Sequence, residues 1–124
     1  MRFMMMVKAA ENYGLPPKAL MDAMEKLTQD AVKNHTMVMG GGLAPTAQSN
    51  RVRLSSGKIS VIDGPFTESK EVIGGFAIME LKSKEEALEV AKHFIDLHRQ
   101  HWPGWEGESE VRQMFGMEDV PPKA

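Results

Sequence analysis

A chain of 124 residues, of which 42% are hydrophobic and 26% charged, is large and apolar enough to fold as one globular domain. Its formal net charge of −2, with Lys and Arg dispersed along the chain, excludes a strong electrostatic surface for nucleic acid or anionic membranes. The lack of cysteine excludes disulfides and thiolate chemistry, and the longest apolar runs are too short to cross a bilayer. We therefore expect a cytoplasmic protein without nucleic-acid or membrane partners.

The first predicted strand is Phe3–Val7, a continuous apolar run bounded by charged residues, as is typical of a strand covered on both faces. A helix is predicted from Pro17 to the region of Asn34, because proline suits the first helical position and apolar residues recur at helical spacing. These residues are Leu20, Met24, Leu27 and Ala31. Their single stripe predicts that the helix packs with one side on a sheet.

A short second strand, Met37–Met39, is predicted to end at Gly40–Gly42. The glycine run lacks the Lys-Ser/Thr pair and the following helix that a phosphate-binding loop needs. We interpret it as a bulge or a bend at the end of the strand.

Asn50–Asp63 has the pattern of a β-hairpin with a two-residue turn at Ser56-Gly57. Two apolar pairs then share one face of the hairpin, Leu54 with Ile59 and Val52 with Val61. Arg51 and Arg53 point to the other face. Asp63, opposite Asn50 at the base of the hairpin, falls on the apolar face, which is an unusual place for a carboxylate.

The last third of the chain predicts a strand, a helix and a final strand. The fourth long strand is Phe76–Leu81, and the Gly74-Gly75 pair before it is interpreted as part of the chain reversal after the hairpin. Ser83 and Glu86 have the spacing of a capping box, so the second helix begins there and ends at Trp102-Pro103-Gly104. Alternation over Ser109–Phe115 predicts the last strand.

This order of elements predicts an α+β fold, the ferredoxin-like two-layer sandwich with two helices on one face of an antiparallel sheet. Residues 1–116 form the single predicted domain, and residues 117–124 are predicted to be a loose C-terminal tail. The helix-free face of the sheet needs a cover, and a second copy of the chain is the simplest one. We therefore expect a homodimer.

Asp63-Gly64-Pro65-Phe66, followed by Gly74-Gly75-Phe76, resembles the signature of the DGPF group of the YCII-related proteins. The methionine-rich first strand and Gly41-Gly42-Leu43-Ala44-Pro45 are similar to the same family. The resemblance implies a dimeric α/β barrel, in which two ferredoxin-like units pack their sheets together and a cleft lies between sheet and helices. Most members have no known function.

The resemblance also implies two further possibilities. Some members of the family are associated with sigma factors of the extracytoplasmic type, which implies a link to sigma-factor regulation. A related member eliminates chloride from a muconate, and a histidine–aspartate pair has been suggested as its catalytic dyad. The histidine of that pair lies in the first helix, whereas Lys18–Lys33 contains none, so the dyad is not carried over to this chain.

Asp63 is the first candidate catalytic residue, because partial burial on the apolar face of the hairpin would suit a carboxyl group to acid–base chemistry. The alternative is a structural role, since an aspartate before glycine accepts backbone hydrogen bonds in a turn. His35 is a candidate substitute base on its titration range. Its alternative role is to cap the carbonyl groups at the end of the first helix.

Four further residues are candidate ligand-binding groups: Arg51, Arg53, Lys70 and Phe66. The two arginines would clamp a carboxylate through paired hydrogen bonds, although ordinary solvated strand faces carry the same residues. Lys70 is a candidate ligand contact in the charged loop that starts at Thr67. We interpret that loop as solvated, with Phe66 packed inward.

His98 and His101 are one helical turn apart and would face the same metal ion, with His93 or Glu106 as a third ligand. Trp102 and Trp105 lie in the same segment. A plug at the helix end, over the cleft or against the dimer partner, explains this segment more simply. We therefore predict no metal site and no cofactor.

Three hypotheses for the function are carried forward. The first is a homodimeric small-molecule-binding or regulatory domain with its ligand in the cleft between sheet and helices. The second is a cofactor-free enzyme on an aromatic or lactone-derived organic acid, with Asp63 as acid or base and Arg51 or Arg53 as the substrate clamp. The third is an interaction module tied to sigma-factor regulation, which requires a large exposed apolar patch outside the dimer interface.

Overall fold

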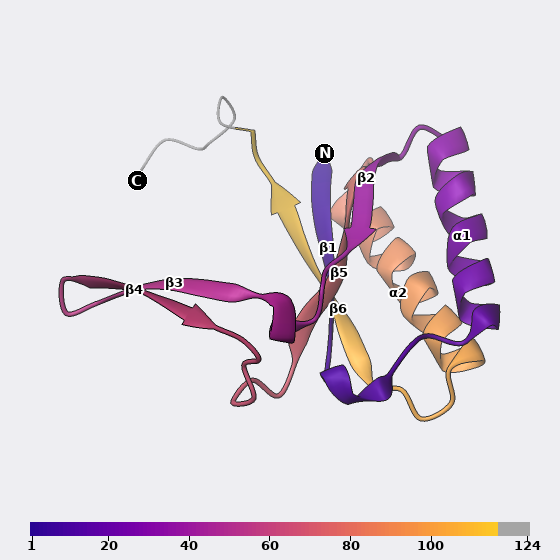
Figure 1. Ribbon diagram of the computed structural model, residues 1–124. Helices are drawn as coiled ribbons and strands as arrows, with labels where there is room; N and C mark the ends of the chain where they lie inside the picture. The colour runs from indigo at the N-terminus through magenta and orange to yellow at the C-terminus, as the bar shows by residue number, and fades with distance from the viewer. Residues whose placement is uncertain (117–124) are drawn as a thin grey trace.

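A computed structural model describes residues 1–116, which form a four-stranded antiparallel sheet, two helices on one of its faces and a separate β-hairpin (Figure 1). The elements in chain order are β1 (Arg2–Ala9), α1 (Lys18–Lys33), β2 (Met37–Gly42), β3 (Asn50–Ser55), β4 (Lys58–Asp63), β5 (Val72–Glu80), α2 (Lys84–His101) and β6 (Gly107–Met114). Two short 3-10 helices, η1 (Glu11–Tyr13) and η2 (Thr46–Gln48), lie in the connections. The predicted tail, residues 117–124, lies outside the described residues.

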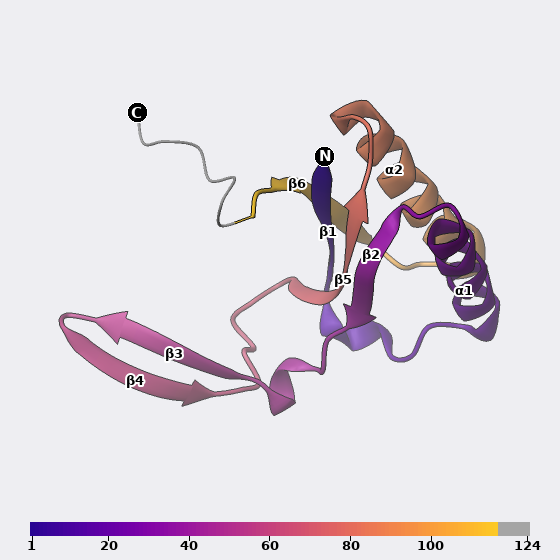
Figure 2. The same cartoon turned by 90° about the horizontal axis from the view of Figure 1, so that it is seen from above.

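The main sheet has the strand order β2-β5-β1-β6, and every neighbouring pair is antiparallel. Its strands belong to two β-α-β units, β1-α1-β2 and β5-α2-β6, whose strands interleave so that β1 and β5 are central. Both helices cover the same face, as Figures 1 and 2 show from two directions. This is the predicted ferredoxin-like α+β sandwich, and the fold class is confirmed.

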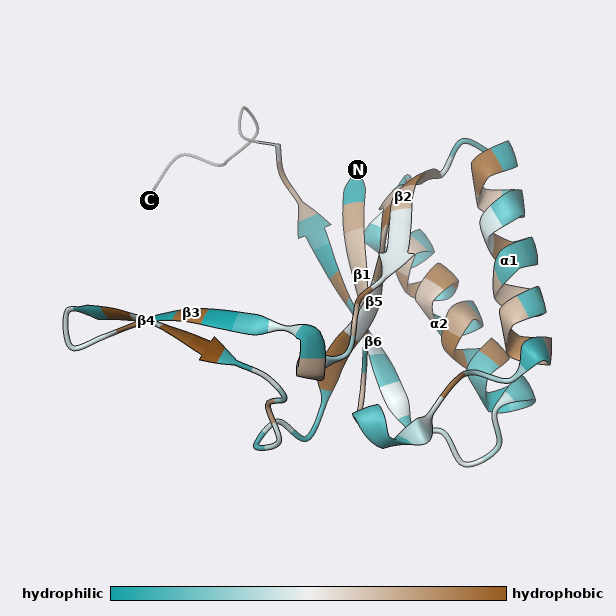
Figure 3. Ribbon diagram, viewed as in Figure 1, coloured by the Kyte–Doolittle hydropathy of each residue, from teal (hydrophilic) through white to brown (hydrophobic). Residues whose placement is uncertain are grey.

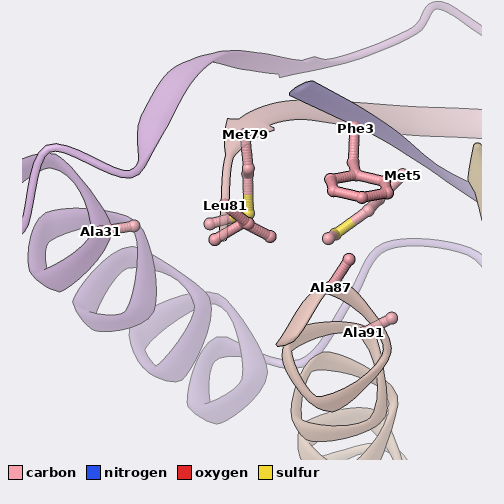
Figure 4. Packing of buried hydrophobic residues seen from close by; sticks show 7 residues of the cluster. All are labelled: Phe3, Met5, Ala31, Met79, Leu81, Ala87 and Ala91. Carbon is pink, nitrogen blue, oxygen red and sulfur yellow. The ribbon is translucent and has the colours of Figure 1, made fainter. Parts of the chain in front are cut away.

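The hydrophobic core lies between the sheet and the helices. Phe3 of β1 pairs with Met79 of β5, and both side chains point to the helices because alternate residues of a strand share a face. The core cluster consists of Phe3, Met5, Ala31, Met79, Leu81, Ala87 and Ala91 (Figure 4). Small alanines on the helices let the backbones approach the larger side chains of the sheet.

Local signals in the sequence account for both helix boundaries. Pro17 is the N-cap of α1 and not its first residue, so the helix begins one residue later than predicted. At the other end, the backbone N–H of Asn34 donates to Asp30 O (2.9 Å). Ser83 Oγ accepts from the backbone N–H of Glu86 (3.1 Å), which confirms the predicted cap of α2. Within residues 1–116, neither helix is long and apolar enough to cross a membrane.

The two glycine runs lie inside strands, and here the predicted boundaries are wrong. β2 continues through Gly40–Gly42, and the irregularity in its pairing lies earlier, between Met37 and Met39. β5 begins at Val72, so Gly74-Gly75 belongs to the strand and not to a chain reversal. The backbones approach closely here, since a Cβ on Gly75 would lie 3.1 Å from Gly41 O. Close approach of the two strands therefore favours glycine at Gly75 and at Gly40, where a Cβ would lie 3.2 Å from Phe76 O, and neither run ends its strand.

The predicted hairpin register is confirmed residue by residue. Leu54 pairs with Ile59 and Val52 with Val61, and Ser56 and Gly57 both have the positive φ values of a two-residue turn (52° and 75°). The hairpin is a sheet of its own, separate from the main sheet, and it projects on the side away from the helices (Figures 1 and 2).

The chain leaves the hairpin through a tightly packed loop. The Gly64 N–H donates to Ser49 O (2.8 Å), the Gly64–Pro65 peptide bond is cis, and a Cβ on Gly64 would lie well inside van der Waals contact with Thr46 O. Thr46 is held in turn by Glu11, whose two carboxylate oxygens accept from the Thr46 N–H and hydroxyl (2.8 Å each). The glycine of the Asp63–Phe66 motif is thus required by close packing at the base of the hairpin.

We expect Gly64→Ala to lower the free energy of unfolding by about 2 kcal/mol, because the added methyl group has to displace the Thr46 carbonyl. Gly74→Ala is the matched control, since a Cβ there meets no atom within 4 Å, and it should change stability by less than about 1 kcal/mol. Urea denaturation of both variants measures the difference. Equal stabilities would contradict the packing argument.

Candidate functional site

A cavity of about 930 Å³ lies between the sheet and the helices. It exists because four paired, helix-facing positions of β2 and β5 carry little or no side chain. Gly40 pairs with Ala77, and Gly42 pairs with Gly75, so four neighbouring positions leave the space beneath the helices unfilled. The large side chains of the core, such as Phe3, fill only the other part of this layer.

One wall of the cavity is aromatic. It is formed by Tyr13, Phe94, His98, Trp102 and Trp105. The His98 ring lies between two neighbours, with ring centroids 4.8 Å from Phe94 and 4.4 Å from Trp105. Trp105 reaches this place because α2 ends in a turn, in which the Trp105 N–H donates to Trp102 O (3.1 Å). Tyr13 completes the wall, with its ring centroid 6.0 Å from that of Trp102.

His98 is the buried polar residue of this wall, with 4% of its surface exposed. Its Nδ1 lies 2.9 Å from Phe94 O, and because a carbonyl oxygen only accepts, Nδ1 carries the proton. Burial lowers the pKa of His98 below its ordinary value, against the smaller opposing effect of the hydrogen bond to Phe94 O. The ring is therefore neutral at pH 7, and its Nε2 is an acceptor.

The second ring nitrogen of His98, Nε2, belongs to a residue that lines the cavity. None of the described residues donates a hydrogen bond to it. Each fully buried side-chain nitrogen or oxygen atom in residues 1–116 has a partner, so Nε2 must retain accessible surface. Because His98 lines the cavity, we infer that this accessible surface of Nε2 faces it.

The charged residues around the cavity are all acidic. They are Glu11, Asp30 and Glu86, and within residues 1–116 no lysine or arginine lines the cavity. Glu11 accepts from Thr46, and Glu86 accepts from the backbone N–H of Lys82 (3.0 Å), so both carboxylates are held by the protein itself. The lining offers no positive charge to an anionic ligand.

None of the six candidate site residues from the sequence lines this cavity. Asp63 is exposed, and one of its oxygens accepts from the side-chain amide of Asn50 (2.5 Å). His35 is exposed just after α1, in the left-handed region with φ 60°. Arg53 and Lys70 are also exposed. The structure does not bring these four residues together, and their roles remain predictions.

Arg51 and Phe66 do come together, on the polar face of the hairpin. The guanidinium carbon of Arg51 lies 3.7 Å from the centroid of the Phe66 ring, and Phe66 is buried, as expected for the anchor of the loop. Arg51 also donates to Glu68 (2.5 Å) and to Ser69 Oγ (3.1 Å). The pKa of Glu68 is lowered by a hydrogen bond from its own backbone and then by Arg51. This cluster holds the loop against the hairpin.

Tyr13 was not assigned to the cleft from the sequence, and the segment from His98 to Trp105 was interpreted only as a plug, over the cleft or against the dimer partner; Tyr13, His98 and Trp105 all line the cavity. The signal for His98 was present, because its helical spacing places it on the buried face of α2 with Ala91 and Phe94. The metal alternative for His98 and His101 has no support, since residues 1–116 contain no group of three or more His, Asp or Glu side chains able to hold a metal.

The fold and the cleft define a class: a ferredoxin-like α+β domain with an apolar cavity between sheet and helices. Residues 1–94 match the YCII-related domain, and the chain belongs to the YCII-related family. A stretch of 50 residues is 42% identical to an uncharacterized protein of Rhizobium meliloti (strain 1021), and it spans 40% of this chain and 40% of that protein. The family match ends at Phe94, so His98, Trp102 and Trp105 lie beyond it.

We expect acid to destabilise the wild type more than a His98→Gln variant. Because the pKa of His98 is lowered in the folded chain, the unfolded chain binds the extra proton below pH 6.5, the ordinary pKa of the ring. The stability contributed by the neutral ring is present above pH 6.5 and declines as the pH falls toward the folded pKa. Urea denaturation at pH 7.5, 6.5 and 5.5 measures this difference.

The control for this comparison is His93→Gln, because His93 is exposed on the same helix. It should retain the wild-type dependence of stability on pH. If the free energies of unfolding of His98→Gln and of the wild type change in parallel from pH 7.5 to 5.5, the conclusion that His98 is buried and neutral is wrong.

Proposed function

We propose that this YCII-related protein is a homodimeric domain that binds a small molecule in the cleft between its sheet and helices. The observation that carries the proposal is the cavity of about 930 Å³, which is within the size range of small-molecule pockets. Its lining is mainly apolar and contains a few polar groups, among them His98, as binding sites do.

The remainder of the lining suits an apolar ligand. Four methionines, Met5, Met24, Met37 and Met79, come from β1, α1, β2 and β5. Their flexible thioether side chains adapt to the shape of a bound molecule. The bare backbone of the glycines on β2 and β5 adds a flat surface beside them.

The helix-free face of the main sheet supports the homodimer. Alternation along β1 places Met4 and Met6 on this face, and the register places Ile78 opposite Met4 and Phe76 opposite Met6. Four apolar side chains therefore form a continuous patch on the face that the helices do not cover. A second copy of the chain is the cover we propose for this patch.

The hairpin supports the same arrangement. The side chains on its apolar face are strongly exposed: Val52 73%, Leu54 72%, Ile59 74% and Val61 67%. A two-stranded hairpin is marginally stable alone, and Figure 3 shows hydrophobic residues along both of its strands. The hairpin projects on the same side as the uncovered sheet face. We propose that it packs on the sheet of the second copy, which would give the dimeric barrel expected from the family resemblance.

The positions of the other candidates favour binding over the organic-acid enzyme. Asp63 is exposed outside the cavity, and Arg51 already donates to Glu68 and Ser69. An acid substrate would also meet only acidic charges in the cleft. The exposed apolar face of the hairpin is the feature that would suit a sigma-factor-associated partner. Sedimentation of the wild type distinguishes such a partner from a second copy of the chain. The cytoplasmic location remains part of this proposal.

We expect Ala77→Leu to close the cleft. Ala77 lines the cavity and packs against the core, so a larger side chain fills existing space. The variant should lose binding of N-phenyl-1-naphthylamine, a neutral probe that fluoresces in apolar sites, and gain about 0.5–2 kcal/mol in stability. Ile78→Leu, one residue further on the opposite face, should retain probe binding. Unchanged binding in Ala77→Leu would rule out this cavity as the site.

We expect Ile59→Lys to weaken the dimer at least ~100-fold, because it buries an unpaired charge in the interface. Ser60→Lys adds the same charge to the opposite face of the hairpin and should leave the dimer intact. Sedimentation velocity measures both, with circular dichroism to show that the fold is retained. A wild-type chain that is monomeric at micromolar concentration would overturn the homodimer and leave the hairpin face to a different partner.

A further inference from the structure

His98 presents an acceptor that the protein itself leaves without a donor. Its Nδ1 proton is donated to Phe94 O, and its ring lies between Phe94 and Trp105, tilted against both, so a 180° turn of the ring would break the hydrogen bond to Phe94 O. The lone pair of Nε2 is therefore fixed in direction. A ligand that removes water from this atom without replacing the hydrogen bond loses affinity.

The surroundings of this acceptor are apolar and aromatic. Trp102 and Trp105 lie with their rings nearly parallel, 22° apart, and the two are the tryptophans of the chain. Aromatic faces of this kind favour a flat ring in offset or edge contact. The glycines of β2 and β5, Gly40, Gly42 and Gly75, add a surface without side chains.

The charges at the cleft select against ionised ligands. A carboxylate or phosphate would meet Glu11, Asp30 and Glu86 and no cationic partner among the residues that line the cavity in the described chain. A cation is attracted by aromatic faces. However, Glu11 and Asp30 are exposed and Glu86 is only half-buried, so no buried carboxylate is present to compensate a desolvated cation.

We propose that the ligand of this cleft is an uncharged, ring-bearing molecule that donates one hydrogen bond, from an O–H or N–H group, to His98 Nε2. This assignment rests on the proposed ligand-binding function. It gives His98 the role of a specificity-determining residue. It also places the selectivity in the segment from His98 to Trp105, beyond the part of the chain that matches the family.

Three naphthalene derivatives of similar size test the assignment: 2-naphthol, 2-methoxynaphthalene and 2-naphthoate. The first is neutral and donates a hydrogen bond, the second is neutral without a donor, and the third is an anion. Titrations followed by the two tryptophan indole N–H signals in nitrogen–proton NMR spectra report directly on the cleft. We expect 2-naphthol to bind about tenfold more tightly than 2-methoxynaphthalene, and at least ~100-fold more tightly than 2-naphthoate.

Two variants identify the acceptor. His98→Phe retains an aromatic ring between Phe94 and Trp105 but has no acceptor, so 2-naphthol and 2-methoxynaphthalene should bind it equally. His98→Gln restores an acceptor oxygen and should recover part of the preference for 2-naphthol. A preference that persists unchanged in His98→Phe would overturn the role of Nε2.

The remaining outcomes separate this assignment from the function on which it rests. If the wild type binds 2-naphthol and 2-methoxynaphthalene equally, or binds 2-naphthoate or the cation naphthalen-2-yl-trimethylammonium most tightly, the assignment is wrong while the cleft remains a binding site. If none of the four binds at millimolar concentration, or if Ala77→Leu binds them as the wild type does, the cleft is not a site for such molecules and the proposed function fails as well.

Discussion

The cavity between sheet and helices results from the small residues at paired, helix-facing positions of β2 and β5, Gly40, Gly42, Gly75 and Ala77. A sandwich of this kind normally fills the layer between sheet and helices with large apolar residues, and Phe3, Met5 and Met79 do so in one part of it. Gly40, Gly42 and other small residues leave the remainder open. A space this large is unfavourable in a protein that has no use for it, because its lining atoms lose packing contacts. This is the physical reason for treating the cavity as a functional feature.

The most distinctive motif of the sequence and the candidate site are different parts of the molecule. The Asp63–Phe66 stretch serves structure: Gly64 allows close contact with Thr46, and Phe66 is buried beneath the guanidinium of Arg51. The chemistry that suits a ligand lies instead at the C-terminal end of α2. A motif that identifies a family can therefore mark the packing that the fold needs, while the groups that touch a ligand lie where the sequence shows no motif.

Features that depend on local signals were predictable from the sequence. The hairpin register follows from alternation around Ser56-Gly57, and the start of α2 follows from Ser83. Features that depend on distant partners were not. The glycines of β2 were interpreted as a strand end, because glycine weakens an isolated strand, and only the pairing of β2 with β5 places them inside a strand. The separation of the hairpin from the main sheet likewise depends on tertiary packing that a strand pattern does not encode.

The candidate site, too, depends on distant partners that the sequence pattern does not reveal. The helical spacing places His98 on the buried face, but its tautomer is set by Phe94 O and its orientation by Trp105, which returns through a turn after the helix.

A chain of hydrogen bonds links the cleft to the hairpin. Glu11 lines the cavity and accepts two hydrogen bonds from Thr46, and Thr46 Oγ1 in turn accepts from the backbone N–H of Phe66 (3.4 Å). One carboxylate therefore joins the rim of the proposed ligand site to the base of the proposed dimer contact. Because these groups are in direct contact, substitutions at Glu11 and Thr46 should not act independently, and their effects on the cleft and on the hairpin have to be measured together.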